Sequence, residues 1–144
     1  MGAVMNLQGW ILGLSATAAS LGLASAQQIP DPLANQEEIV RRTSNTWNKP
    51  FHFPQKVPEV TASIIEYPPG AGGLRHTSPY SRYIYVLEGT LTFDLGGGSL
   101  VDFQAGSLIL SGSTWLTLKN NGVVPAKALV IDQTEVGESN SVPK

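Results

Sequence analysis

From Val60 onward, the chain is divided into short runs of β-branched and aromatic residues, and a turn signal ends each run. The run at 60–67 stops at Pro68-Pro69-Gly70, for example, and Asn121-Gly122 is a strong hairpin signal. Short runs at such close spacing are typical of an all-β sandwich or barrel. The pattern predicts about seven strands, at 60–67, 83–87, 90–95, 100–103, 107–110, 115–119 and 126–132.

The composition agrees with one small β domain and excludes several classes of protein. The length of 144 residues fits a single domain, and 15 glycines with 10 prolines supply many turns. A formal net charge of −2 gives no electrostatic reason to expect a nucleic-acid partner. Because the chain has no cysteine, disulfides, thiolate metal ligands and a cysteine nucleophile are all excluded.

Residues 1–26 have the composition of an export signal. They contain no charged side chain, their apolar stretch covers 10–23, and they end in Ala24-Ser25-Ala26. Small residues at these last positions fit the cleft of a signal peptidase. We predict cleavage after Ala26 and an exported chain, secreted or periplasmic, that does not bind a membrane after cleavage. The alternatives are an uncleaved membrane anchor and a true start at Met5.

An arm is predicted between the signal and the barrel. Asn35 is placed to cap a short helix at 35–42, and three later prolines keep the rest of the arm extended. Trp47, Phe51 and Phe53 are predicted to dock this arm on the barrel wall. The predicted organisation is a signal peptide at 1–26, the arm at 27–58, a barrel at 59–133 and a flexible tail at 134–144.

A first motif begins at Gly70. Five residues separate this glycine from His76, and Ser78, Arg82 and Gly89 follow at fixed intervals. These intervals match the first motif of the cupin family, Gly-x5-His-x-His-x3,4-Glu-x6-Gly, with Ser78 at the second His position and Arg82 at the Glu position.

A second motif runs from Gly106 to Asn120, sixteen residues after the first motif ends. It resembles the second cupin motif, with Ser111 at the Pro position and Leu116 at the His position. The chain therefore resembles a small single-domain cupin-2-like protein with altered metal-binding motifs. The resemblance implies a cupin-type β-barrel, which is a jelly-roll-like double-stranded β-helix.

The family holds its metal at four positions, which in this sequence are occupied by His76, Ser78, Arg82 and Leu116. A divalent metal needs three or four nitrogen or oxygen donors at about 2 Å. Leucine has no lone pair, and the guanidinium of arginine is always positive and cannot accept. We therefore predict no metal and no other cofactor at this place. The alternative is a rebuilt metal site that uses Glu88, Asp94 or Asp102.

Strand alternation predicts which side chains face the interior. If Arg82 faces inward, so do Ile84 and Val86, and Leu118 shares the face of Leu116. The predicted cavity has apolar walls and a polar end. The candidate ligand-binding residues are His76, Ser78, Tyr80, Arg82, Leu116 and Leu118.

Less specific interpretations of the polar residues stay open. Arg82 could point outward or pair with Glu66 or Glu88 and have a purely structural role. His76 could be a hydrogen-bonded residue of the cavity mouth rather than a catalytic base, and Tyr80 could be a packing residue.

Three functions compete. The first is an exported, metal-free binding module for a small organic anion, with no catalytic residue assigned. The second is an enzyme, either a metal-dependent cupin of the dioxygenase, isomerase or decarboxylase type with a rebuilt site, or one that uses His76 as a general acid or base. The third is a structural β-barrel that forms a homodimer, as members of the family often do.

Overall fold

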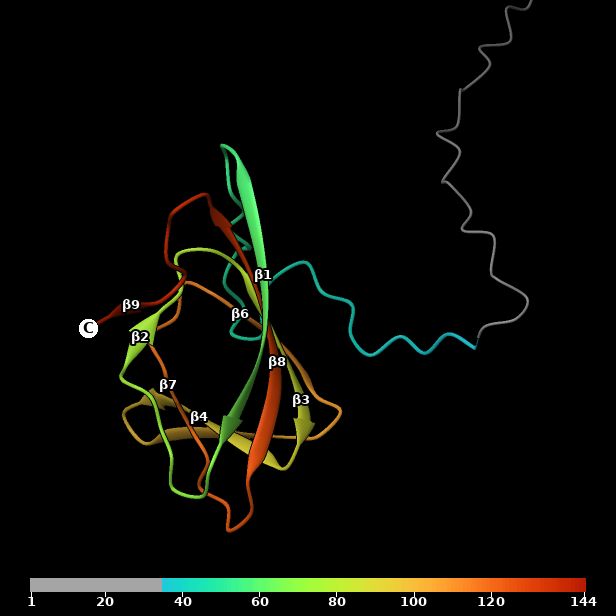
Figure 1. Cartoon of the computed structure of the whole chain (residues 1–144), viewed down its shortest axis with the longest axis vertical. Coiled ribbons are helices and arrows are strands. Elements are labelled where there is room, and N and C mark those ends of the chain that lie inside the picture. Colours follow the sequence, from blue (N-terminus) through green and yellow to red (C-terminus); the bar gives the residue numbers. More distant parts are fainter. Residues whose placement is uncertain (1–34) are drawn as a thin grey trace, which may run out of the picture. The chain divides into compact units, whose positions relative to one another are not determined.

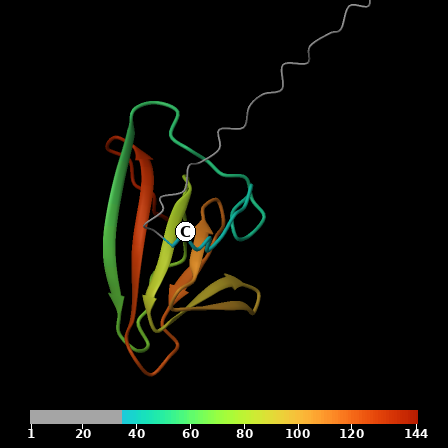
Figure 2. The same ribbon diagram turned by 90° about the vertical axis from the view of Figure 1, so that its right-hand side faces the viewer.

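The strands of residues 35–144, the part of the chain described by this computed structural model, form three sheets (Figure 1). The strand orders are β1-β8-β3-β6, β5-β4-β7 and β2-β9, and Figure 2 shows the four strands of the largest sheet side by side. The predicted all-β fold is confirmed for this part, and the segment predicted as a signal peptide lies outside the described residues. The strands are β1 (Pro58–Tyr67), β2 (His76–Thr77), β3 (Arg82–Glu88), β4 (Thr90–Gly96), β5 (Ser99–Gln104), β6 (Leu108–Ser111), β7 (Thr117–Lys119), β8 (Ala126–Glu135) and β9 (Val142–Pro143).

The core forms because alternate residues of the central strands face inward. In β3, Ile84 and Val86 are buried while their neighbours are more exposed, as the alternation predicts. The facing sheet contributes Leu91 and Phe93, both fully buried. Within residues 35–144, no helix is long and apolar enough to span a membrane.

The arm differs from its prediction in one respect. Residues 35–42 contain no helix in the structure, because nearly all of them are exposed and a helix this short is unstable without packing. Trp47 docks as predicted, with its ring centroid 5.8 Å from that of Phe93 and 6.1 Å from that of Phe103. Phe53 remains 46% exposed, so Trp47 is the stronger of these anchors.

The C-terminal residues are held against the barrel and do not match the flexible tail predicted at 134–144. β8 continues to Glu135, and β9 pairs with β2. Asn140 is buried, and its side chain accepts a hydrogen bond from the backbone N–H of Tyr80. The polar residues of this segment led to the prediction of a loose tail, but in the structure Asn140 forms specific hydrogen bonds with the barrel.

The turn between β3 and β4 depends on Gly89. Its φ of 71° is in the left-handed region, and a Cβ atom there would lie 2.7 Å from the carbonyl oxygen of Pro125. Gly97 also has a positive φ, 62°, but a Cβ atom there would meet no described heavy atom within 4 Å beyond its chain neighbours. An alanine at position 97 would therefore cause backbone strain alone, whereas an alanine at position 89 would cause both backbone strain and a steric clash.

We expect Gly89→Ala to destabilise the protein far more than Gly97→Ala does. The backbone conformation alone costs about 1–2 kcal/mol at either position, whereas the clash at Gly89 adds about 1–3 kcal/mol of overpacking. Urea unfolding of the two variants measures the difference. Equal losses of unfolding free energy would contradict the close approach of the 89 and 125 backbones.

Candidate functional site

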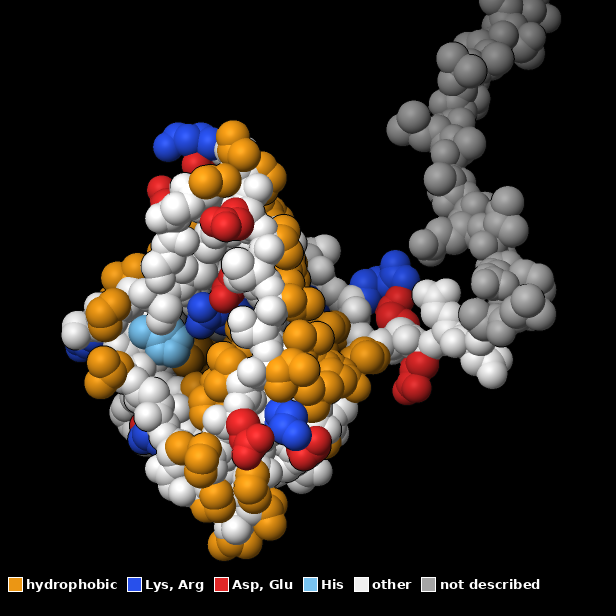
Figure 3. Space-filling model, viewed as in Figure 1, with side chains coloured by type: hydrophobic (Ala, Val, Ile, Leu, Met, Phe, Trp, Pro, Cys, Tyr) orange, Lys and Arg blue, Asp and Glu red, His pale blue; other side chains and the backbone are white. Residues whose placement is uncertain are grey.

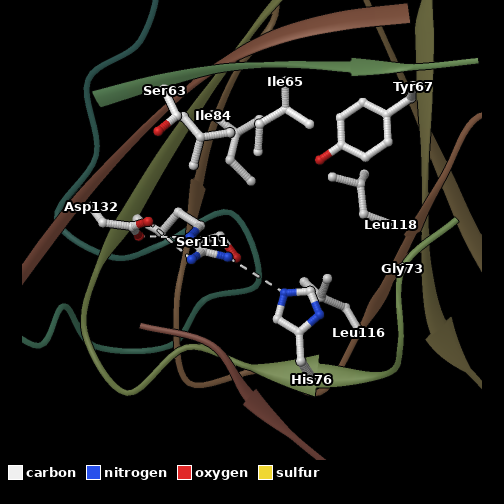
Figure 4. Close-up of a pocket in the computed structure, with 12 residues that line it drawn as sticks. Ser63, Ile65, Tyr67, Gly73, His76, Ile84, Ser111, Leu116, Leu118 and Asp132 are labelled. Atoms are coloured by element: carbon white, nitrogen blue, oxygen red, sulfur yellow. Dashed lines mark hydrogen bonds and ion pairs between the residues drawn. The ribbon is translucent and has the colours of Figure 1, made fainter. Parts of the chain in front are cut away.

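A cavity of about 150 Å³ opens at the inner face of the four-stranded sheet. Figure 3 shows the hollow on the molecular surface, with a histidine ring at its edge, a basic side chain beside it and apolar atoms below. Figure 4 shows its lining residues. The apolar lining side chains are Ile65, Ile84, Leu116, Leu118 and Val130, and the polar ones are Ser63, Tyr67, His76, Arg82, Ser111 and Asp132.

The central polar feature is an ion pair between Arg82 and Asp132, which face each other across β3 and β8. The guanidinium donates from Nε to Oδ1 at 2.6 Å and from Nη2 to Oδ2 at 3.0 Å. Both side chains are only about one-sixth exposed, at 15% and 16%. Such a two-bond contact fixes the plane of the guanidinium and balances its charge.

The tail supports this pair. Asn140 donates from Nδ2 to Oδ1 of Asp132 at 2.6 Å, and its own Oδ1 is held by the backbone N–H of Tyr80. The carboxylate therefore accepts three hydrogen bonds, two from Arg82 and one from Asn140. The position of the arginine in the cavity depends on a residue close to the C-terminus.

The hydrogen bonds of His76 determine which ring nitrogen carries a proton. Nδ1 lies 3.0 Å from the carbonyl oxygen of Leu74, and Nε2 lies 3.5 Å from Nη1 of Arg82. Because a carbonyl oxygen can only accept, Nδ1 is the donor. The lone pair of Nε2 then faces the guanidinium. Two backbone hydrogen bonds between His76 and Leu116, each 2.9 Å, hold the ring in this place.

Tyr67 supplies a donor on another wall. Its hydroxyl points into the cavity in Figure 4. Burial raises the pKa of this hydroxyl, and the charge of Arg82, which acts to lower the pKa, offsets only part of that effect. The phenol is therefore protonated at neutral pH.

Four of the six predicted ligand-binding residues line the cavity, namely His76, Arg82, Leu116 and Leu118. Ser78 is buried, its carbonyl oxygen accepts a hydrogen bond from the N–H of Ser113, and the cavity lining does not include it. The hydroxyl of Tyr80 donates to Glu138, also away from the cavity. These two predicted residues are therefore not part of the cavity lining.

Asp132 and Tyr67 were missed by sequence reasoning, although a signal existed for each. The inward alternation Ala126, Ala128, Val130 in β8 continues to Asp132, and that of β1 ends at Tyr67. The sequence analysis considered Glu66 and Glu88 as partners for Arg82. Asp132 is the partner because it lies directly opposite Arg82 in the strand register.

The residues present do not fit a divalent metal. Nε2 of His76 faces a guanidinium, and a cation a few Å from that charge is repelled by about 4 kcal/mol per pair of unit charges. The proposed substitute donors already have partners: Glu88 pairs with Lys127, Asp94 with Lys119 and Asp102 with Thr92. Across residues 35–144, no three His, Cys, Asp or Glu side chains gather closely enough to hold a metal ion.

We expect Asp132→Asn to destabilise the fold, because it leaves a largely buried guanidinium without its counter-charge. The loss of unfolding free energy should be about 2–4 kcal/mol, near the range for breaking a buried ion pair. Glu88→Gln removes a carboxylate from the more exposed pair with Lys127 and is the matched control, with little expected change. Denaturant titrations in which both variants behave alike would contradict the structural importance of the Arg82–Asp132 pair.

A comparison with protein-family models matches residues 63–132 to the family described as Cupin domain. None of the curated proteins compared with the chain matches it. The chain is similar to a solved cupin-2 domain containing protein from Shewanella frigidimarina, with 14% identity and a TM-score of 0.45 over 52% of this chain and 71% of that one.

Two further solved structures are similar to this chain. A double-stranded β-helix domain protein from Klebsiella pneumoniae has 14% identity and a TM-score of 0.49, over 65% of this chain and 91% of that one. A putative sugar phosphate isomerase from Acidithiobacillus ferrooxidans has 22% identity and a TM-score of 0.47, over 52% of this chain and 50% of that one. The family match covers both motifs and the strands that line the cavity, so residues 63–132 form a cupin domain.

Proposed function

We propose that this protein is an exported, metal-free binding module whose cavity holds a small organic molecule, without catalysis of its own. The observation that carries the proposal is Arg82, whose guanidinium lines the cavity at the sequence position of a cupin metal-binding carboxylate. Apolar walls with a few convergent polar groups are typical of small-molecule sites. The cavity has this composition, with its charged groups at one end.

The Arg82–Asp132 pair determines how a ligand is held. Because the two charges balance, a ligand meets a nearly neutral pair and gains its affinity mainly from hydrogen bonds. A guanidinium has five N–H groups, and Asp132 uses one on Nε and one on Nη2. The others, with the hydroxyl of Tyr67, are donors for the polar group of a ligand. The small organic anion predicted from the sequence remains one such ligand.

Binding is favoured over catalysis by the state of the titratable groups. The carboxylate of Asp132 already accepts from Arg82 and Asn140, so it is not placed to act as a base. Among its described lining residues the cavity therefore offers one imidazole, the protonated phenol of Tyr67 and no free carboxylate. Export with cleavage after Ala26 is part of the proposal.

We expect metal-free protein to be stabilised by some members of a panel of small carboxylates, carboxamides and ketones. A ligand at about 100 times its Kd raises the unfolding free energy by about 2.7 kcal/mol, which a thermal-shift assay detects. Arg82→Lys keeps a positive charge beside Asp132 but removes the planar donors, so it should abolish the shift. Arg75→Lys is the matched control, because Arg75 contacts the carbonyl oxygens of Leu95 and Trp115 outside the cavity.

Two results would contradict this function. One is a ligand-induced shift that survives Arg82→Lys unchanged. The other is stabilisation by the panel only after a divalent metal has been restored.

A second role is proposed for the outer face of the four-stranded sheet, which would join two copies of the chain. Two rows of side chains cross this face, and each follows the observed register of the strands. The rows contain no charged residue, and all of their side chains except that of Leu110 are at least partly exposed. Exposed apolar patches are typical of protein interfaces. The rows are Ala62, Ile131, Tyr83 and Leu110, then Ile64, Leu129, Tyr85 and Leu108.

We expect the protein to sediment as a dimer and Ile64→Lys to sediment as a monomer, because a lysine would bury its charge in the apolar interface. Ile64 is 67% exposed within one chain. Val123→Lys is the control, since Val123 is 92% exposed on a loop away from this face. A monomeric parent protein, or a dimer that persists in Ile64→Lys, would contradict the dimer.

A further inference from the structure

We infer that the cavity selects a ligand with a primary carboxamide group on an apolar body about the size of a benzene ring. This inference rests on the proposed function, binding of a small molecule at Arg82, and names the class of ligand. It depends on which atoms at the polar end donate and which accept, and on the size of the apolar part.

The polar end presents one donor beside one acceptor. Nη1 of Arg82 can only donate, whereas Nε2 of His76 accepts because the proton of the ring is on Nδ1, which donates a hydrogen bond to the carbonyl oxygen of Leu74. The two atoms are 3.5 Å apart, which is long for a hydrogen bond between them, so neither is fully satisfied. Both residues line the cavity. A complementary ligand group must therefore accept from Nη1 and donate to Nε2.

A carboxamide meets both requirements, because its oxygen accepts and its NH₂ group donates from the same carbon. A carboxylate has two acceptor oxygens, so one of them would face the lone pair of Nε2. It would also add a negative charge where Arg82 and Asp132 already balance. The ionisable groups that face His76 are Arg82 from β3, Asp132 from β8 and Tyr67 from β1, and the adjacent β9 (Val142–Pro143) contributes none.

The remaining walls determine the size of the apolar part. Ile65, Ile84, Leu118 and Val130 surround the space beyond the polar end, and the cavity volume is about 150 Å³. A buried apolar cavity of about this volume is able to hold benzene. Because this volume includes the polar end, the apolar body is no larger than a six-membered ring or a branched chain of similar size.

Isothermal titration of the metal-free full chain tests this inference with three probes. Benzamide carries both the acceptor and the donor, benzoate carries two acceptors, and N,N-dimethylbenzamide keeps the acceptor but has no N–H. An unpaired buried polar group weakens binding substantially, so we expect the Kd of benzamide to be about tenfold or more below those of the other two.

Two His→Phe variants test whether Nε2 of His76 accepts a hydrogen bond from the ligand, because only one of the two histidines lies in the cavity. His76→Phe keeps a ring but removes Nε2, and we expect it to raise the Kd of benzamide about tenfold while leaving that of N,N-dimethylbenzamide nearly unchanged. His52→Phe is the control, because the ring of His52 contacts the Ser113 hydroxyl outside the cavity, and its Kd for benzamide should equal that of the parent.

Three results would overturn the inference: benzoate binding as tightly as benzamide, a benzamide Kd that His76→Phe does not change, or no binding of any probe. The first two leave the proposed function intact, because a small molecule still binds. In the third case the wider panel and Arg82→Lys decide separately whether the proposed function also fails.

Discussion

The polar end of the cavity depends on the contact between Arg82 and Asp132. Two charges that are each about five-sixths buried must be paired and hydrogen-bonded, because desolvation costs more than an unaided Coulomb attraction returns. The strand register of β3 and β8 supplies the pairing, and Asn140 supplies a further hydrogen bond to the carboxylate. Once the guanidinium is fixed in this way, its Nη1 faces Nε2 of His76. The geometry of the cavity's polar end therefore depends both on the strand register of the sheet and on the docked tail.

The same contact explains why the residues that line the polar end of the cavity do not fit a divalent metal. One imidazole remains, but its free nitrogen faces a permanent cation, and Leu116 closes the wall where the family has another histidine. What the barrel offers is a small cavity, open to the surface, with apolar walls and a polar end. Binding of a small molecule uses these properties directly, whereas metal-dependent chemistry would need donors that the lining does not offer.

Periodicity predicted the strands and that Arg82, Ile84 and Val86 share one face of their strand, because alternation is a local property of each strand. It did not predict the partner of Arg82, which lies fifty residues away and is selected by strand register. It also did not predict the docked tail, since one buried asparagine at position 140 outweighs a composition typical of loose termini. Local sequence patterns therefore could not predict the contacts between distant segments that complete the site.

Metal content tests the central claim most directly. Purified protein, produced with Mn, Fe and Zn available and then dialysed, is analysed for its metal content. The account predicts far less than one metal atom per chain, because a guanidinium paired with Asp132 occupies the position of a family ligand. One tightly held Mn, Fe or Zn per chain would show that the polar end of the cavity is a metal centre and would contradict the account.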